Sequence, residues 1–190
     1  MSYEPYQIMA SALALKLGNG KLRIKRKVGV GVRGMTACPC AQKLMAEQAV
    51  ARLGEAKGSR ELVKKVPIAT HMQRSYGLLI TSVPEKFEID AFKLTEIVEN
   101  SMSAPSFGLL KRVDEVEVVR RATERPLFAE DVIRLMMVNF VKAFPELPDE
   151  TVVLFKVRSE ESIHKHDLVA KRKVTLKVLR SEMKVNNLEV

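Results

Sequence analysis

Alternating apolar residues at the two ends of the chain constrain its fold more than any other feature. Near the N-terminus, the alternation continues on both sides of a Gly-Asn-Gly turn at residues 18–20, which predicts an antiparallel hairpin. Near the C-terminus, extended runs are expected at 152–158 and 168–179, and in the second run Leu176 and Val178 fall at alternate positions. Both ends of the chain therefore predict strands paired as antiparallel hairpins.

The middle of the chain shows mostly the spacing of helices. Helices are expected at 41–53, from a cap at Asp90, at 109–123 and after Pro126. A short apolar strand is expected at 76–83, and a polar surface loop at 55–65. The order of strands, helices and strands predicts an α+β fold, and 190 residues are enough for a single domain, 1–190, with a buried core.

The balance of charge limits the classes of partner. The formal net charge is +9, which favours a polyanion such as a nucleic acid or a triphosphate, unless the basic side chains only solvate the surface. Aromatic residues make up 5% of the chain and Trp is absent, so stacking platforms for single-stranded nucleic acids are poorly supplied. No run of about eighteen apolar residues occurs, so no membrane partner is expected.

The two cysteines, Cys38 and Cys40, are separated only by Pro39. This spacing is a poor geometry for a disulfide between them, and two cysteines do not make a disulfide framework. Free thiols and a cytoplasmic location are therefore predicted.

Three short clusters hold both cysteines and all three histidines. They are Cys38-Pro39-Cys40, the segment around His71, and residues 161–167, in which His164 and His166 lie among carboxylates. Thiolate, imidazole and carboxylate together are the ligands of zinc and ferrous sites. Because only folding can bring such distant segments together, the pattern indicates an enzyme site, and we hypothesise a metal-dependent hydrolase.

Several of the candidate residues also have a plainer structural interpretation. Cys38 precedes a predicted helix, where the dipole favours a thiolate, but two small buried residues would give the same pattern. His164 and His166 share a face if their segment is extended, yet such pairs also occur on surfaces. Glu130 falls in the first turn of a helix, where the dipole alone favours an acidic residue. The joint pattern, rather than any single motif, favours a metal site.

Five segments occur in an order that characterises one known family. They are Gly34-Met35-Thr36-Ala37-Cys38-Pro39-Cys40-Ala41-Gln42, His71-Met72-Gln73-Arg74, Leu110-Lys111-Arg112-Val113-Asp114-Glu115, Phe128-Ala129-Glu130-Asp131 and Glu161-Ser162-Ile163-His164-Lys165-His166-Asp167. Together they resemble the metal-dependent GTP cyclohydrolases of type IB. The first segment is closest to their archaeal branch, also called GTP cyclohydrolase IV.

The resemblance implies the tunnelling fold, in which antiparallel sheets with helices packed on one face associate into a barrel across subunits. It also implies a homo-oligomer that binds GTP where subunits meet. Family members are usually longer, with another half-domain before the Cys-Pro-Cys segment, so residues 1–190 are expected to match their C-terminal part.

The resemblance further implies a role for individual residues. The implied metal ligands are Cys38, His71, Glu115 and Glu161. The implied catalytic histidine is His164, with His166 as its neighbour, and Glu130 matches the carboxylate that anchors the purine. For the triphosphate, charge alone favours Arg74, Lys111 and Arg112, or the basic strand at 21–27.

The implied reaction is hydrolysis of GTP at C8 of the guanine, which opens the imidazole ring and releases formate. In the archaeal branch the implied metal is Fe²⁺ and the implied product is 7,8-dihydroneopterin 2′,3′-cyclic phosphate, a precursor in methanopterin biosynthesis; bacterial relatives make the triphosphate. The predicted ligand set also accepts Zn²⁺ or Mn²⁺. The alternatives are another tunnelling-fold enzyme of pterin or deazapurine chemistry, and a basic nucleic-acid-binding module with a structural metal.

Overall fold

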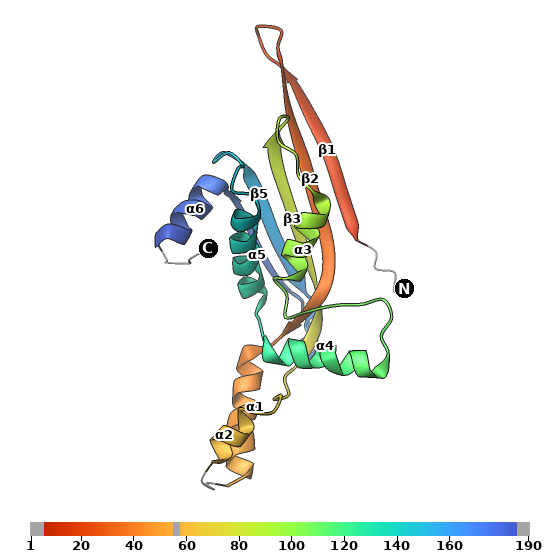
Figure 1. Ribbon diagram of the computed structural model, residues 1–190, viewed down its shortest axis with the longest axis vertical. Coiled ribbons are helices and arrows are strands. Elements are labelled where there is room, and N and C mark those ends of the chain that lie inside the picture. The colour runs from red at the N-terminus through yellow and green to blue at the C-terminus, as the bar shows by residue number, and fades with distance from the viewer. Residues whose placement is uncertain (1–5, 55–57, 186–190) are drawn as a thin grey trace.

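A computed structural model of the chain describes residues 6–54 and 58–185. Its centre is an antiparallel six-stranded sheet in the order β1-β2-β3-β5-β6, with a short strand β4 paired to β2 (Figure 1). The strands are β1 (Gln7–Lys16), β2 (Leu22–Ala37), β3 (Met72–Pro84), β4 (Ala104–Pro105), β5 (Val152–Ser159) and β6 (Leu168–Thr175). Together with the helices, this sheet confirms the α+β fold.

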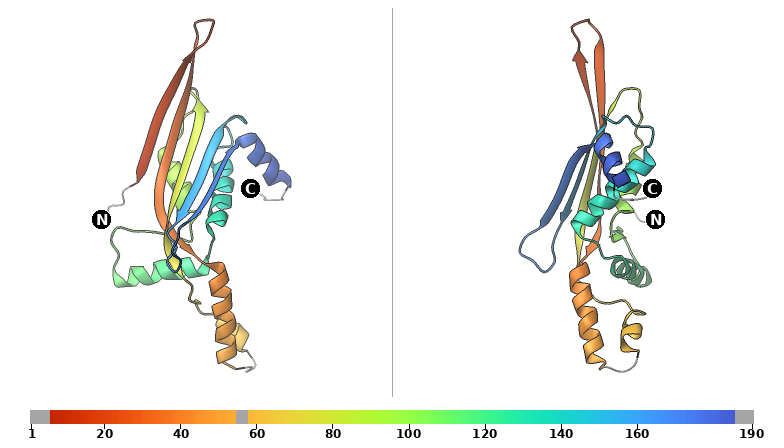
Figure 2. Two further views of the ribbon diagram at one scale, coloured as in Figure 1. Left: turned by 180° about the vertical axis from the view of Figure 1, so that it is seen from behind. Right: turned by 90° about the vertical axis from the view of Figure 1, so that its left-hand side faces the viewer.

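Three helices cover one face of the sheet, as the side view in Figure 2 shows: α3 (Ala91–Glu99), α5 (Ala129–Ala143) and α6 (Leu176–Val185). Strand side chains that point toward them, such as Val30, Leu79 and Phe155, are fully buried. Met136 and Phe140 of α5 are buried in the same cluster. Each fully buried apolar side chain of this size stabilises the fold by about 1.5–3 kcal/mol.

The remaining helices lie at one end of the sheet, and they are α4 (Arg112–Glu124), α1 (Pro39–Arg52) and α2 (Ser59–Val63). In Figure 1, α1 and α2 project away from the sheet, and α1 has no buried residue. Gln42 connects the first turn of α1 to the segment before β3 and to the end of α4. Its side-chain amide donates to the backbone oxygens of Ile68 at 3.2 Å and Thr123 at 2.6 Å. None of the described helices is both long and apolar enough to cross a membrane.

Several local expectations are confirmed. β1 and β2 pair from Gln7↔Gly31 to Lys16↔Leu22 around the expected turn, where Gly20 has a φ of 78° that favours glycine. Asp90 caps α3, since its carboxylate accepts a hydrogen bond from the backbone nitrogen of Phe92 at 2.8 Å. The helices expected at 41–53 and after Pro126 are α1 and α5.

The bounds or the type of three expected elements differ from the structure. The extended run 168–179 ends at Thr175, because Leu176, Leu179 and Met183 are buried at helical spacing and form α6. The strand expected at 76–83 begins at Met72, since its pairing with β2 continues to Ala37. The loop expected at 55–65 contains α2, while residues 55–57 lie outside the described part.

Candidate metal centre

The candidate site lies at the end of the sheet where β2 ends, β3 begins and β5 ends. Three buried hydroxyls join these strands there, and we call Thr36, Ser75 and Ser159 the hydroxyl triangle. Thr36 Oγ1 lies 2.8 Å from Ser75 Oγ and 3.1 Å from Ser159 Oγ, and Ser75 Oγ donates to Ser159 Oγ at 3.3 Å. None of the three residues is more than 1% exposed. The triangle therefore anchors the strand ends that lead into the site.

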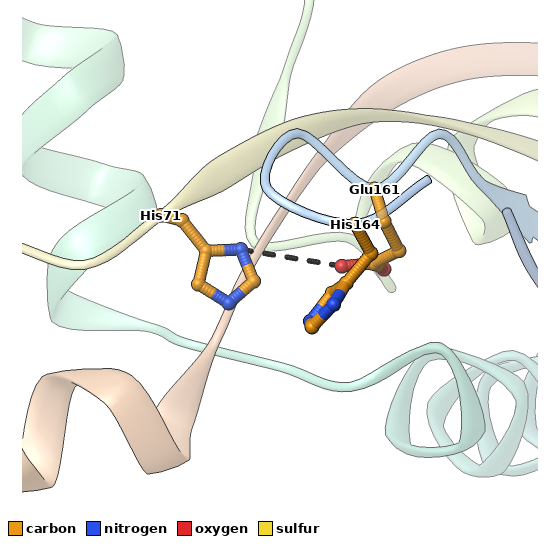
Figure 3. A group of neighbouring side chains, drawn as sticks. All are labelled: His71, Glu161 and His164. Atoms are coloured by element: carbon orange, nitrogen blue, oxygen red, sulfur yellow. Dashed lines mark ion pairs between the residues drawn. The ribbon is translucent and has the colours of Figure 1, made fainter. Parts of the chain in front are cut away.

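Three of the predicted site residues converge beyond the hydroxyl triangle: His71, Glu161 and His164 (Figure 3). One ligand atom from each lies within 4.8 Å of the others. His71 Nδ1 is 4.0 Å from Glu161 Oε2, and the rings of His71 and His164 meet edge-on with their centroids 6.1 Å apart. The side chains of His71 and Glu161 are only 12% and 11% exposed, whereas His164 is exposed. We call these three residues the metal group.

The chemistry of the metal group fits a divalent transition metal. Two imidazoles and one carboxylate are accepted by both zinc and ferrous iron. Ligand atoms that each lie about 2.0–2.2 Å from a shared ion are within about 4.4 Å of one another. The atoms of the metal group lie within 4.8 Å of one another, which is slightly beyond that limit, so the three side chains must move a little closer together to hold such an ion.

Gln73 links two members of the metal group. Its amide oxygen lies 3.0 Å from Nδ1 of His71, and its amide nitrogen donates to Oε1 of Glu161 at 3.2 Å. Sequence analysis predicts no function for Gln73. Side chains two apart in a strand share a face, but the strand was expected to begin only at Tyr76, which concealed the relation between His71 and Gln73.

Cys38 lies beside His71 along the backbone. Its nitrogen donates to the backbone oxygen of His71 at 3.1 Å, and the hydroxyl of Thr70 donates to the backbone oxygen of Cys38 at 2.6 Å. The thiol is at the N-terminus of α1, as expected, where Sγ accepts a hydrogen bond from the nitrogen of Ala41 at 3.4 Å. Among the described residues both Cys38 and Cys40 are free thiols, and Sγ of Cys38 is not part of the metal group.

The other predicted site residues lie on several elements and outside the metal group. His166 stacks on His164, with ring centroids 5.4 Å apart. Exposed side chains at the starts of α4 and α5 include Lys111, Arg112, Glu115 and Glu130. Arg74 is exposed and points to the face of β3 opposite Gln73. Glu115 does not belong to the metal group in the described chain, so its role as a ligand stays a prediction.

Helix α4 carries an ion-pair ladder of its own. Glu117 accepts hydrogen bonds from Arg120 and Arg121, and these lower the pKa of its carboxyl from 4.5 to about 2. Arg120 also pairs with Glu124 one turn further along. The ladder includes none of the predicted site residues, so it supports the helix that presents Glu115 rather than the metal group itself.

Comparison with known proteins agrees with the family that the five motifs predicted. The model of the family described as type I GTP cyclohydrolase folE2 matches residues 1–170. Over 187 residues, the chain is 44% identical to GTP cyclohydrolase MptA of Methanococcus aeolicus, 43% to that of Methanococcus maripaludis strain C5 and 41% to that of Methanococcoides burtonii. Each alignment covers 96% of this chain but only 59–60% of the relative, so the chain spans about three fifths of the length of these relatives. The chain belongs to the type I GTP cyclohydrolase folE2 family.

Proposed function

We propose that this chain acts in the metal-dependent hydrolysis of GTP, in which attack at C8 opens the guanine imidazole ring and formate leaves. The observation that carries the proposal is the convergence of His71, Glu161 and His164 in a chain of this family. The relatives are named GTP cyclohydrolases, which supports GTP as the substrate. The product would be 7,8-dihydroneopterin 2′,3′-cyclic phosphate, or the triphosphate, for pterin and methanopterin biosynthesis.

In this proposal His71 and Glu161 hold the metal from the buried side of the site. We assign Cys38 as a further ligand, because thiolates bind such ions and the backbone of Cys38 is hydrogen-bonded to that of His71. The metal is Fe²⁺, with Zn²⁺ and Mn²⁺ as alternatives, because the donor set accepts all three. When bound, such an ion supplies a hydroxide at neutral pH by lowering the pKa of its water from about 15.7 to near 7.

Although His164 converges with His71 and Glu161 in the metal group, we assign it to proton transfer rather than to metal binding. It is exposed and its ring stacks on that of His166, so it faces the side from which a substrate can enter. An imidazole there can give a proton to the ring nitrogen as the C8–N bond breaks, and regain one from solvent. His164 and His166 are therefore assigned to proton transfer.

The substrate contacts are assigned to exposed charged residues of the five motifs. The carboxylate of Glu130 can accept hydrogen bonds from a guanine N–H and its amino group. Arg74, Lys111 and Arg112 supply cations for the triphosphate. These residues lie on β3 and at the starts of α4 and α5, so the proposal includes a homo-oligomer in which subunits together enclose GTP.

The test is anaerobic incubation of the purified chain with Fe²⁺ and GTP, followed by measurement of formate release and of pterin fluorescence after oxidation. Cys38→Ala and His164→Ala should abolish turnover, whereas Ser162→Ala, an exposed neighbour in the same loop as His164, should leave it unchanged. Turnover that survives the first two variants at an unchanged rate would show that the site is wrongly assigned.

The remaining outcomes separate the alternatives. One iron bound per chain without turnover would indicate a pocket that needs residues beyond this chain, which spans about three fifths of the length of the relatives. Absence of both iron binding and turnover would refute the proposed metal site. It would favour the basic nucleic-acid-binding module, which predicts binding that weakens steeply with salt.

A further inference from the structure

Gln73 contacts two members of the metal group from the buried side of the site. It is only 7% exposed, so its amide oxygen and nitrogen need partners within the protein. Those partners are Nδ1 of His71 at 3.0 Å and Oε1 of Glu161 at 3.2 Å. One rigid planar amide thus spans an imidazole and a carboxylate. That imidazole and that carboxylate face the same space (Figure 3).

The chemistry of the partners determines how the protons are arranged. An ionised carboxylate only accepts hydrogen bonds, so the amide nitrogen of Gln73 must face Glu161. The amide oxygen then faces His71 and can only accept, which requires a proton on Nδ1 of His71. Glu161 Oε2 lies 4.0 Å from that nitrogen, too far to replace Gln73 as the acceptor. With a proton on Nδ1, the ring nitrogen of His71 that has a free lone pair is Nε2.

We propose that Gln73 is a positioning residue of the metal centre. Its oxygen holds His71 in the Nδ1–H tautomer, so that Nε2 is the metal ligand, and its nitrogen holds Oε1 of Glu161, so that Oε2 is free to bind. This inference rests on the proposed function, because it gives Gln73 a role only if the metal group binds an ion. Histidine ligands generally donate their second N–H to such a neighbour, and loss of that neighbour typically weakens metal binding by about 10–100-fold.

An amide is the side chain that can serve both partners at once. A methionine in its place keeps most of the volume but neither hydrogen bond. A glutamate keeps an acceptor for His71 but places a second carboxylate against Glu161 and loses the donor. The variants Gln73→Met and Gln73→Glu therefore separate the effect on His71 from the effect on Glu161.

The first test reads the tautomer of His71 in the full chain without added metal, by ¹⁵N-edited NMR of the histidine rings. The wild-type chain and Gln73→Glu should hold His71 as Nδ1–H, whereas Gln73→Met should shift it toward Nε2–H. A wild-type His71 in the Nε2–H form, or a tautomer that Gln73→Met leaves unchanged, would overturn the inference.

The second test titrates the full chain anaerobically with Co²⁺ as a spectroscopic probe and measures affinity by calorimetry. Gln73→Met should weaken Co²⁺ binding by about 10–100-fold and change the visible absorption of the bound ion. The matched control is Ser75→Ala. Ser75 lies two residues from Gln73 in the same strand, and its side chain is hydrogen-bonded to Thr36 and Ser159, neither of which belongs to the metal group. The control variant should lower stability but leave Co²⁺ affinity, spectrum and the tautomer unchanged.

The outcomes distinguish this inference from the proposed function. If the wild-type chain binds no Co²⁺, the proposed metal site fails, and Gln73 with it. If the wild-type chain binds Co²⁺ and Gln73→Met binds it equally well, only the role of Gln73 fails. If Ser75→Ala weakens binding as much as Gln73→Met, Gln73 acts through the stability of the fold and the inference is refuted.

Discussion

Removal of the Ser75 hydroxyl should destabilise the fold by about 1–3 kcal/mol, since each of its hydrogen bonds contributes about 0.5–1.5 kcal/mol net. Ser75 is fully buried and bonds to Thr36 at 2.8 Å and to Ser159 at 3.3 Å. In Ser75→Ala, Thr36 and Ser159 still face each other at 3.1 Å, so neither hydroxyl loses every partner. The cost should therefore equal the two lost bonds, without the larger penalty of an unsatisfied buried group.

Urea unfolding followed by far-ultraviolet circular dichroism measures this change. The urea concentration at the midpoint of unfolding should fall. The slope of the unfolding free energy against urea concentration should stay the same, because the surface exposed on unfolding is the same. For a chain of this size, a loss of about 2 kcal/mol corresponds to a melting temperature lower by about 4–8 °C. Ser162→Ala removes an exposed hydroxyl and should stay within about 0.5 kcal/mol of the wild-type chain.

The double variant Ser75→Ala/Ser159→Ala tests the geometry of the triangle. The two serines share one hydrogen bond, so the double variant should cost less than the sum of the single variants by about 0.5–1.5 kcal/mol. Additive effects, or a Ser75→Ala chain as stable as the wild type, would refute the argument that these hydroxyls join three strands.

Three further results are expected. Phe155→Ala should cost about 3–5 kcal/mol in the same urea assay, because Phe155 is fully buried beneath Phe140. The ionised carboxylate of Glu117 stabilises the folded chain at pH values above 4.5, the pKa of this carboxyl in the unfolded chain. This stabilisation is lost as the pH falls toward about 2, the pKa of the same carboxyl in the folded chain. The wild-type free energy of unfolding should therefore fall more steeply over that range than that of Glu117→Gln, and equal slopes would contradict the ladder on α4. Saturation with Zn²⁺ at about 100 times its dissociation constant should stabilise the wild-type chain by about 2.7 kcal/mol, and chelation should reverse this; a stabilisation that persists in His71→Ala would place the ion elsewhere.

The C-terminal segment shows where the sequence misleads. Val174, Leu176 and Val178 alternate as in a strand, whereas Leu176, Leu179 and Met183 recur as in a helix. Both periods fit within one short window, so local pattern alone does not decide between them. The structure selects the helix after Thr175, because Leu176, Leu179 and Met183 then join the core that α5 forms on the sheet.

The cysteines and histidines of the candidate site could be predicted from the sequence, because these residue types are rare in this chain. Both cysteines and all three histidines fall in three clusters, and the structure brings two of those clusters together as the metal group. Gln73 could not be found in this way, since glutamine is common and carries no characteristic chemistry. Its position depends on the register of β3 against β2, in which Thr36 pairs with Gln73.

That register also explains how distant clusters come to meet. Cys38 follows Thr36 by two residues, His71 precedes Gln73 by two, and Glu161 follows Ser159 by two. The pairs Thr36↔Gln73 and Ser75↔Ser159 bring these three strand ends level with one another. A slip of one residue would turn every side chain of a strand to the opposite face and separate Gln73 from Glu161.

The hydroxyl triangle stabilises this register but does not determine it alone. Leu79 and Phe155 are opposite each other in the same two strands, and a slipped register would expose them to water. Their burial contributes about 1.5–3 kcal/mol each, which is at least as much as the about 1–3 kcal/mol expected for the bonds of Ser75. For this reason Ser75→Ala should weaken the fold without moving Glu161. Gln73→Met, in contrast, should leave the strands in register and still impair metal binding, because it removes the only group shown to orient both His71 and Glu161 among the described residues.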